Sequence, residues 1–115
     1  MLRPLQRATW AASLLGVAYL LWRFESFQAP AGLAPTVGLA PEERGILDLR
    51  PQTLGAGDIV LYADTSGLRH FARLQGAAGA EDVAPERWTA TGDDGRPLEV
   101  PRAAVLGRVI LVWPF

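Results

Sequence analysis

One histidine, His70, is the only side chain in this sequence that ordinarily acts as a base near neutral pH. All eleven cationic side chains are arginines, and a guanidinium stays protonated, so it cannot replace a lysine as a general base or Schiff-base amine. The candidate nucleophiles are Ser13, Ser26 and Ser66, of which Ser66 lies close to His70 in the sequence. Nothing in the sequence positions a third group or an oxyanion hole beside this pair. A Ser–His arrangement is therefore the alternative to a structural role for His70.

Other kinds of chemistry are excluded by what the composition lacks. Cysteine is absent, which excludes disulfides, thiolate catalysis, zinc–thiolate sites and iron–sulfur ligation. Asp93 and Asp94 form an acidic pair, but the residues after them lack the alternating oxygens and the closing glutamate of a calcium loop. The net charge is −1 without a basic run, so we expect no nucleic-acid partner. We also expect no metal and no cofactor, and we interpret the acidic pair as part of a solvated turn.

The elements that must carry these residues begin with an apolar segment. From Ala8 to Trp22 the sequence is apolar apart from Thr9 and Ser13. A helix from Leu5 to Phe24 would measure about 30 Å, which is the thickness of the hydrocarbon core of a bilayer. We therefore predict a transmembrane signal anchor within residues 1–27, with its tryptophan and tyrosine rings at the membrane interfaces.

Flanking charges predict the orientation of this anchor. Arg3 and Arg7 precede it and Arg23 follows it, which predicts a cytoplasmic amino terminus and a domain on the outer, periplasmic or equivalent, side. A cleaved signal peptide is the alternative, because residues 29–31 have the small-x-small form of a cleavage site. The proline inside that site disfavours cleavage, so we interpret the segment as uncleaved.

Small residues recur at every fourth position along the predicted anchor. Ala8, Ala12 and Gly16 form a stripe of the kind that lets two membrane helices approach closely. This pattern favours packing against other membrane-protein subunits, in addition to contact with membrane lipid.

The rest of the sequence is divided by turn-forming residues into a linker and a series of short strands. Prolines and glycines over residues 28–44 predict an extended linker without a helix. Closely spaced apolar runs then predict an antiparallel β domain over residues 45–115. The predicted strands are Ile46–Leu49, Ile59–Ala63, Leu68–Leu74, Arg87–Thr91, Leu98–Val100 and Val105–Trp113. Alternation along Leu68–Leu74 predicts one apolar face, which includes His70, and one face that reaches water.

Four motifs of this β domain resemble those of a known family. They are Gly57–Tyr62, His70–Gly76, Thr91–Asp94 and Val105–Val109. In that order they resemble the Gly-Asp-hydrophobic strand, the hydrophobic-Lys-Arg strand, the Gly-Asp-Asn box and the closing strand of the type I signal peptidase and LexA-type protease superfamily. Residues 32–37 can be aligned with the family's Ser-Met-x-Pro-Thr-hydrophobic motif. The resemblance implies a signal-peptidase-like β fold from about Gly32 to the end of the chain.

The same resemblance locates two catalytic positions, and neither holds a catalytic side chain. Gly32 stands where the family has its nucleophilic serine, and Ala72 stands where it has its lysine base. In the reaction that the resemblance implies, the serine attacks a peptide carbonyl while the neutral lysine accepts its proton. Loss of one member of such a unit costs nearly as much as loss of the whole set. We therefore expect a pseudoenzyme, since a chain without lysine cannot form a Ser–Lys dyad.

The carboxyl end adds a candidate contact surface. Residues 105–115 are strongly apolar, and Trp113 and Phe115 are candidate contacts for a partner or for the membrane interface. Together these features predict a non-catalytic, membrane-anchored binding or assembly subunit of a membrane protein complex, for instance a respiratory or photosynthetic one. A divergent signal-peptidase-like protease that uses a Ser–His arrangement is the alternative.

Overall fold

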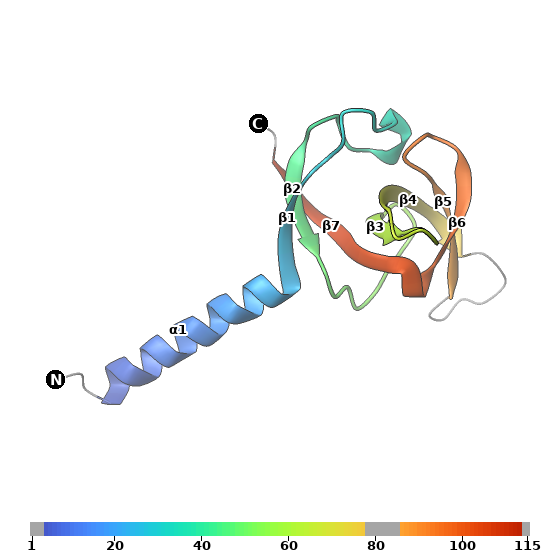
Figure 1. Ribbon diagram of the computed structural model, residues 1–115. Coiled ribbons are helices and arrows are strands. Elements are labelled where there is room, and N and C mark those ends of the chain that lie inside the picture. Colours follow the sequence, from blue (N-terminus) through green and yellow to red (C-terminus); the bar gives the residue numbers. More distant parts are fainter. Residues whose placement is uncertain (1–3, 78–85, 114–115) are drawn as a thin grey trace.

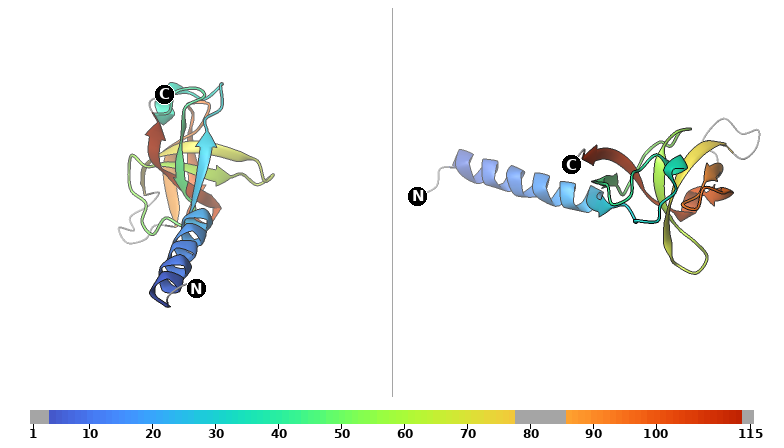
Figure 2. Two further views of the ribbon diagram at one scale, coloured as in Figure 1. Left: turned by 90° about the vertical axis from the view of Figure 1, so that its left-hand side faces the viewer. Right: turned by 90° about the horizontal axis from the view of Figure 1, so that it is seen from above.

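The computed structural model describes residues 4–77 and 86–113, and it begins with a helix that stands apart from a β domain (Figure 1). This helix, α1, spans Pro4–Arg23. Alanine and leucine, which favour helices, make up much of its sequence, and Arg23 in its last turn suits the negative end of the helix dipole. The molecule measures 62 Å along its longest axis and 26 Å along its shortest, because α1 projects from the domain (Figures 1 and 2).

Over the described residues, the β domain is one sheet of seven antiparallel strands in the order β1-β2-β7-β3-β4-β5-β6. The strands are β1 Phe24–Gln28, β2 Arg44–Asp48, β3 Ile59–Ala63, β4 Arg69–Ala77, β5 Arg87–Thr91, β6 Pro97–Pro101 and β7 Val105–Trp113. Register shifts in the β2–β7, β3–β7 and β4–β5 pairs mark irregularities that strengthen twist, and the sheet coils strongly (Figures 1 and 2). The predicted class, mainly β with antiparallel strands and one helix, is confirmed.

The helix is confirmed as an element, but not as a membrane span. Within residues 4–77 and 86–113, no helix combines the length and the apolar character that crossing a membrane requires. The transmembrane anchor expected over Leu5–Phe24 is therefore not supported by α1. Arg7, Thr9 and Ser13 lower the apolar character of its first half.

The first strand, β1, corrects the expected boundary of the amino-terminal segment. The sequence pattern assigns all of residues 1–27 to the anchor, whereas α1 ends at Arg23 and β1 begins at the next residue. β1 pairs with β2, with Ser26 opposite Ile46. Its pattern is hidden in the sequence because the strand is short and continues directly from an apolar helix.

The segment between β1 and β2 packs against the sheet, which corrects the expectation of an extended linker over residues 28–44. Four of its apolar side chains are at most 4% exposed, namely Ala29, Leu33, Val37 and Leu39. A short 3₁₀ helix, η1, spans Pro35–Val37 and is followed by Gly38, whose φ of 95° suits glycine. The prolines and glycines therefore shape turns that place apolar neighbours over the core, where their burial is favourable.

Buried apolar side chains form two clusters along the central strands β3 and β4. One contains the buried residues of the β1–β2 segment together with Leu61 and Phe71. The other contains Val60 and Ala72, their sequence neighbours, whose side chains alternate with them along the strands. β4 therefore buries residues of both faces, which corrects the expected division into an apolar and a wet face: Phe71 is 5% exposed, whereas Leu68 is 63% exposed.

Candidate functional site

Two segments that are far apart in the sequence meet at one side of the β domain. The backbone N–H of Ala34 donates to the carbonyl oxygen of Asp93, in the turn between β5 and β6, at 2.8 Å. Gly95 in this turn has a φ of 81°, and a Cβ there would lie 3.4 Å from Thr36 Oγ1. The structure thus brings together the segments that resemble the Ser-Met-x-Pro-Thr motif and the Gly-Asp-Asn box.

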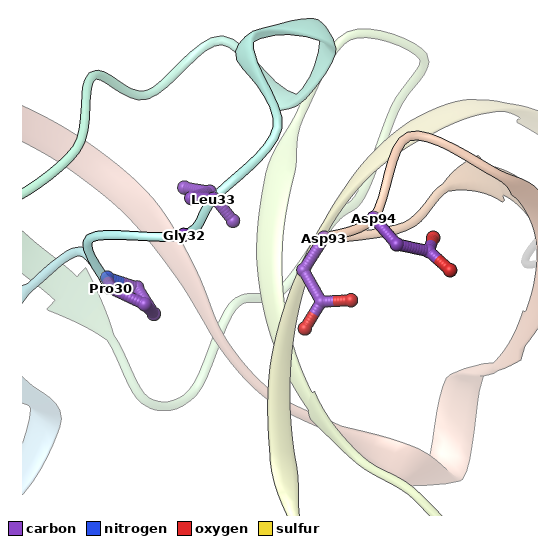
Figure 3. Close-up of a pocket in the computed structure, with 5 residues that line it drawn as sticks. All are labelled: Pro30, Gly32, Leu33, Asp93 and Asp94. Carbon is purple, nitrogen blue, oxygen red and sulfur yellow. The ribbon is translucent and has the colours of Figure 1, made fainter.

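A cavity of about 320 Å³ lies between these two segments. Pro30, Gly32 and Leu33 form one wall, and Asp93 and Asp94 form the other (Figure 3). Gly32 is exposed, and a Cβ built on it would have no neighbour within 4 Å. Position 32 could therefore accommodate a larger side chain, but the glycine present offers no group for chemistry.

Ala72, the second position located by the resemblance, lies in the core. Its side chain is 0% exposed and belongs to the cluster that contains Val60 and Leu74. It pairs with Val60 of β3 and is not among the residues that line the cavity at Gly32. The structure therefore does not bring Gly32 and Ala72 together at the cavity.

His70 on β4 lies between two carboxylates that come from different turns. Its Nε2 is 2.7 Å from Asp64 Oδ2, and its Nδ1 is 2.8 Å from Asp93 Oδ2. Both nitrogens can donate only in the protonated ring, and these hydrogen bonds, first that of Asp64 and then that of Asp93, raise the pKa of His70 above its ordinary value of 6.5. The Tyr62 ring lies 5.6 Å from the imidazole. The two carboxylates therefore favour the protonated imidazole, which is a poor proton acceptor.

Ser66 contacts the carboxylate of Asp64. Its Oγ donates to Asp64 Oδ1 at 2.6 Å, so Asp64 lies between the serine and His70. The hydrogen bonds from Ser66 and His70 hold the pKa of Asp64 well below its ordinary range. A serine activated by histidine needs the imidazole next to its hydroxyl, with the acid beyond it. The order here is different, and the geometry does not favour the Ser–His alternative.

The candidate contact residues belong to α1 and to the carboxyl end of the chain. Ala8, Ala12 and Gly16 are exposed on α1, where nothing in the domain covers them. Trp113 is the last residue of β7 and pairs with Arg44, while Phe115 lies outside the described residues. Among the β7 side chains whose burial is described, the large apolar ones that are exposed are Ile110 and Leu111, at 44% and 49%. Within residues 4–77 and 86–113, no group of three or more acidic, histidine or cysteine residues is placed to hold a metal.

A polar junction at the end of α1 escapes prediction from the sequence. Arg23 donates from Nε and Nη2 to the two carboxylate oxygens of Asp48, at 3.1 and 3.2 Å, and from Nη1 to the Tyr19 hydroxyl at 2.6 Å. Asp48 is only 3% exposed, and although burial alone would raise the pKa of this carboxyl, the hydrogen bond from Arg23 lowers it. The guanidinium of Arg50 stacks on Trp22, 3.8 Å from the ring centroid. The only signal in the sequence is an aspartate at the end of an apolar strand.

No family model, curated protein or solved structure matches this chain. The resemblance to signal peptidases therefore rests on the sequence motifs.

Proposed function

We propose that this protein is a non-catalytic, signal-peptidase-like binding or assembly subunit of a membrane protein complex, held at the membrane by α1. The observation that carries the proposal is the surface of α1. The helix stands clear of the β domain (Figure 1), and its large apolar side chains are exposed, including Leu15 at 72% and Leu21 at 75%. A helix with apolar side chains all round is covered by lipid or protein in its working state.

The limited apolar character of α1 favours packing against other membrane helices over contact with lipid alone. As it is not long and apolar enough to cross a bilayer by itself, we propose that helices of partner subunits cover part of it, beside lipid. Ala8, Ala12 and Gly16 would allow such helices to approach closely. Arg3 and Arg7 at the amino-terminal end, against Arg23 at the end of α1, support a cytoplasmic amino terminus and a β domain on the outer side.

The absence of catalysis in this proposal is supported by three positions. Gly32 has no nucleophile, Ala72 is a buried alanine without a base, and His70 is held between two carboxylates. The domain still offers the outer edge of β1 to a partner, because β1 is at the end of the sheet and, among the described strands, it pairs with β2 alone.

The proposal is tested by extracting the full-length protein from its native membranes in a mild detergent and measuring its mass by native mass spectrometry. We expect a complex of fixed stoichiometry, which the double variant Leu15→Gln and Leu21→Gln loses. Leu68→Gln is the matched control, because Leu68 is 63% exposed but lies in the β3–β4 turn, away from α1. A free monomer in the aqueous fraction, or a complex that the double variant leaves intact, would contradict the proposal.

A further inference from the structure

The end of α1 is fixed to one side of the β domain. No linker separates α1 from β1, and the backbone N–H of Leu49, just after β2, donates to the Arg23 carbonyl at 2.6 Å. The paired hydrogen bonds of Arg23 with the buried Asp48 add a second connection. The loop that leads from β2 to β3 therefore lies on the side of the domain from which α1 departs (Figure 1).

Arg50 in this loop is a cation that stacks on the exposed ring of Trp22 and, within the part of the chain that the structure describes, has no ion-pair partner. The backbone N–H of Arg50 donates to Asp48 Oδ1 at 3.0 Å, which fixes the start of the loop, and the Arg50 guanidinium lies on the ring of Trp22. Trp22 is 54% exposed. Among the described residues, no carboxylate lies within ion-pair distance of the Arg50 guanidinium, and Asp48 forms its ion pair with Arg23.

Two further arginines converge on the same loop. Arg102 donates from Nη2 to the Pro51 carbonyl at 2.9 Å, and Arg108 donates from Nη1 to the Thr53 carbonyl at 3.1 Å. Asp58 lies 3.8 Å from Arg108, so Arg108 is partly neutralised. Arg50 is exposed and, over residues 4–77 and 86–113, has no ion-pair partner.

We propose that Arg50 and Trp22, with Tyr19 one turn earlier on α1, form a binding site for the phosphate of an anionic phospholipid headgroup at the membrane surface. This inference rests on the proposed membrane role of α1. Tryptophan and tyrosine favour the membrane interface, and guanidinium groups bind phosphate through two parallel hydrogen bonds. The rings lie in the last turn of an apolar helix and the arginine lies immediately beyond it, an order that matches hydrocarbon core, interface and headgroup.

Vesicle flotation of the full-length protein tests the site. The probes are vesicles of phosphatidylcholine alone and vesicles with about one third phosphatidylglycerol. We expect the wild type to bind both, with tighter binding to the anionic vesicles. Arg50→Gln should weaken binding to the anionic vesicles about fivefold and leave binding to the neutral vesicles unchanged. Arg69→Gln is the control, since Arg69 is also exposed but lies at the start of β4.

The outcomes separate this inference from the function on which it rests. Equal binding of Arg50→Gln and Arg69→Gln to anionic vesicles overturns the lipid site. If Arg50→Gln instead weakened only the assembly of the native complex, Arg50 would be assigned to an acidic protein surface, which also overturns the lipid site. Failure of the wild type to bind either kind of vesicle counts against the membrane role of α1 itself. Circular dichroism shows whether Arg50→Gln still folds. A second variant, Arg50→Lys, keeps the positive charge but loses the bidentate guanidinium, and it distinguishes a lost site from a lost fold.

Discussion

At the scale of single residues, His70 connects parts of the β domain that are otherwise separate. Its imidazole bonds to Asp64 in the β3–β4 turn and to Asp93 in the β5–β6 turn. The Asp93 carbonyl in turn accepts the N–H of Ala34, in the segment that lines the cavity. Protonated His70 therefore connects the β3–β4 turn to the β5–β6 turn, which forms one wall of the cavity. Its loss of a proton would set a ring lone pair against a carboxylate.

This arrangement predicts a pH-dependent free energy of unfolding. Because the pKa of His70 in the folded protein is raised above its ordinary value of 6.5, its stabilising contribution is complete below about pH 6.5 and is lost as the pH rises through the folded-state pKa. We expect His70→Gln to be less stable than the wild type at about pH 6 and to approach it at high pH. Urea unfolding in mild detergent, followed by circular dichroism at a series of pH values, measures the difference.

The pH range of this experiment must avoid the titration of the other groups beside His70. The pKa of Asp64 is lowered, so its own contribution is present at neutral pH and is lost only under acidic conditions. Burial, and then the charges of Asp93 and Asp64, raises the pKa of Tyr62, which therefore stays neutral near pH 7. Between the acidic titration of Asp64 and the alkaline titration of Tyr62, the free energies of unfolding of His70→Gln and the wild type should therefore converge as the pH rises. Parallel pH profiles of these free energies would show that the imidazole does not hold the two turns together.

At the scale of elements, the junction of β1, β2 and β7 depends on one glycine. Gly45 on β2 pairs with Phe27 on one side and Val112 on the other. A Cβ on Gly45 would collide with the Leu111 carbonyl oxygen and with the Phe27 ring. The absence of a side chain thus lets β1 join the sheet, while Phe27 packs over the glycine against Phe71, with 5.3 Å between the ring centroids.

Gly45→Ala should therefore destabilise the domain by about 1–3 kcal/mol, the usual cost of overpacking in a core. Gly76→Ala on β4 is the matched control, because a Cβ there has no neighbour within 4 Å and Gly76 is not a positive-φ glycine. We expect the control to change the free energy of unfolding by about 0.5 kcal/mol or less. Equal effects of the two variants in chemical denaturation would show that the close approach at Gly45 is readily relieved.

At the scale of the whole molecule, a coiled sheet carries a projecting helix on one side and a cavity between its loops (Figures 1 and 3). The proposed function assigns the helix to attachment and leaves the cavity without catalytic chemistry. The cavity has two carboxylates but no lysine, and the imidazole next to it is engaged on both nitrogens.

The full-length protein in detergent should therefore not hydrolyse a precursor that carries a signal peptide. We expect product formation at the rate of a protein-free blank, both for the wild type and for His70→Ala, because the residues that line the cavity include neither a serine hydroxyl nor a lysine amine. An active signal peptidase in the same detergent is the positive control. Cleavage by the wild type that His70→Ala abolishes would replace the proposed function with a Ser–His protease.

Prediction from the sequence succeeds where structure is local. The helix, and strands such as β3 Ile59–Ala63 and β5 Arg87–Thr91, lie where apolar periodicity and turn residues indicate them. The burial of the segment after β1 is missed, because prolines and glycines report local backbone shape and carry no information about what covers the core. β1 is missed because its pairing with β2 is a contact across a long loop.

The sequence by itself determined that lysine-amine and thiol chemistry are absent, since a chain without lysine or cysteine has no such side chain in any fold. It also determined the helix and most strands, because their patterns depend on neighbours a few residues away. Only the tertiary structure decided the partners of the charged groups: Asp48 lies 25 residues from Arg23, and Asp93 lies 23 residues from His70. The physical reason is that local periodicity specifies which face a side chain occupies, whereas strand order and sheet coiling decide what that face meets.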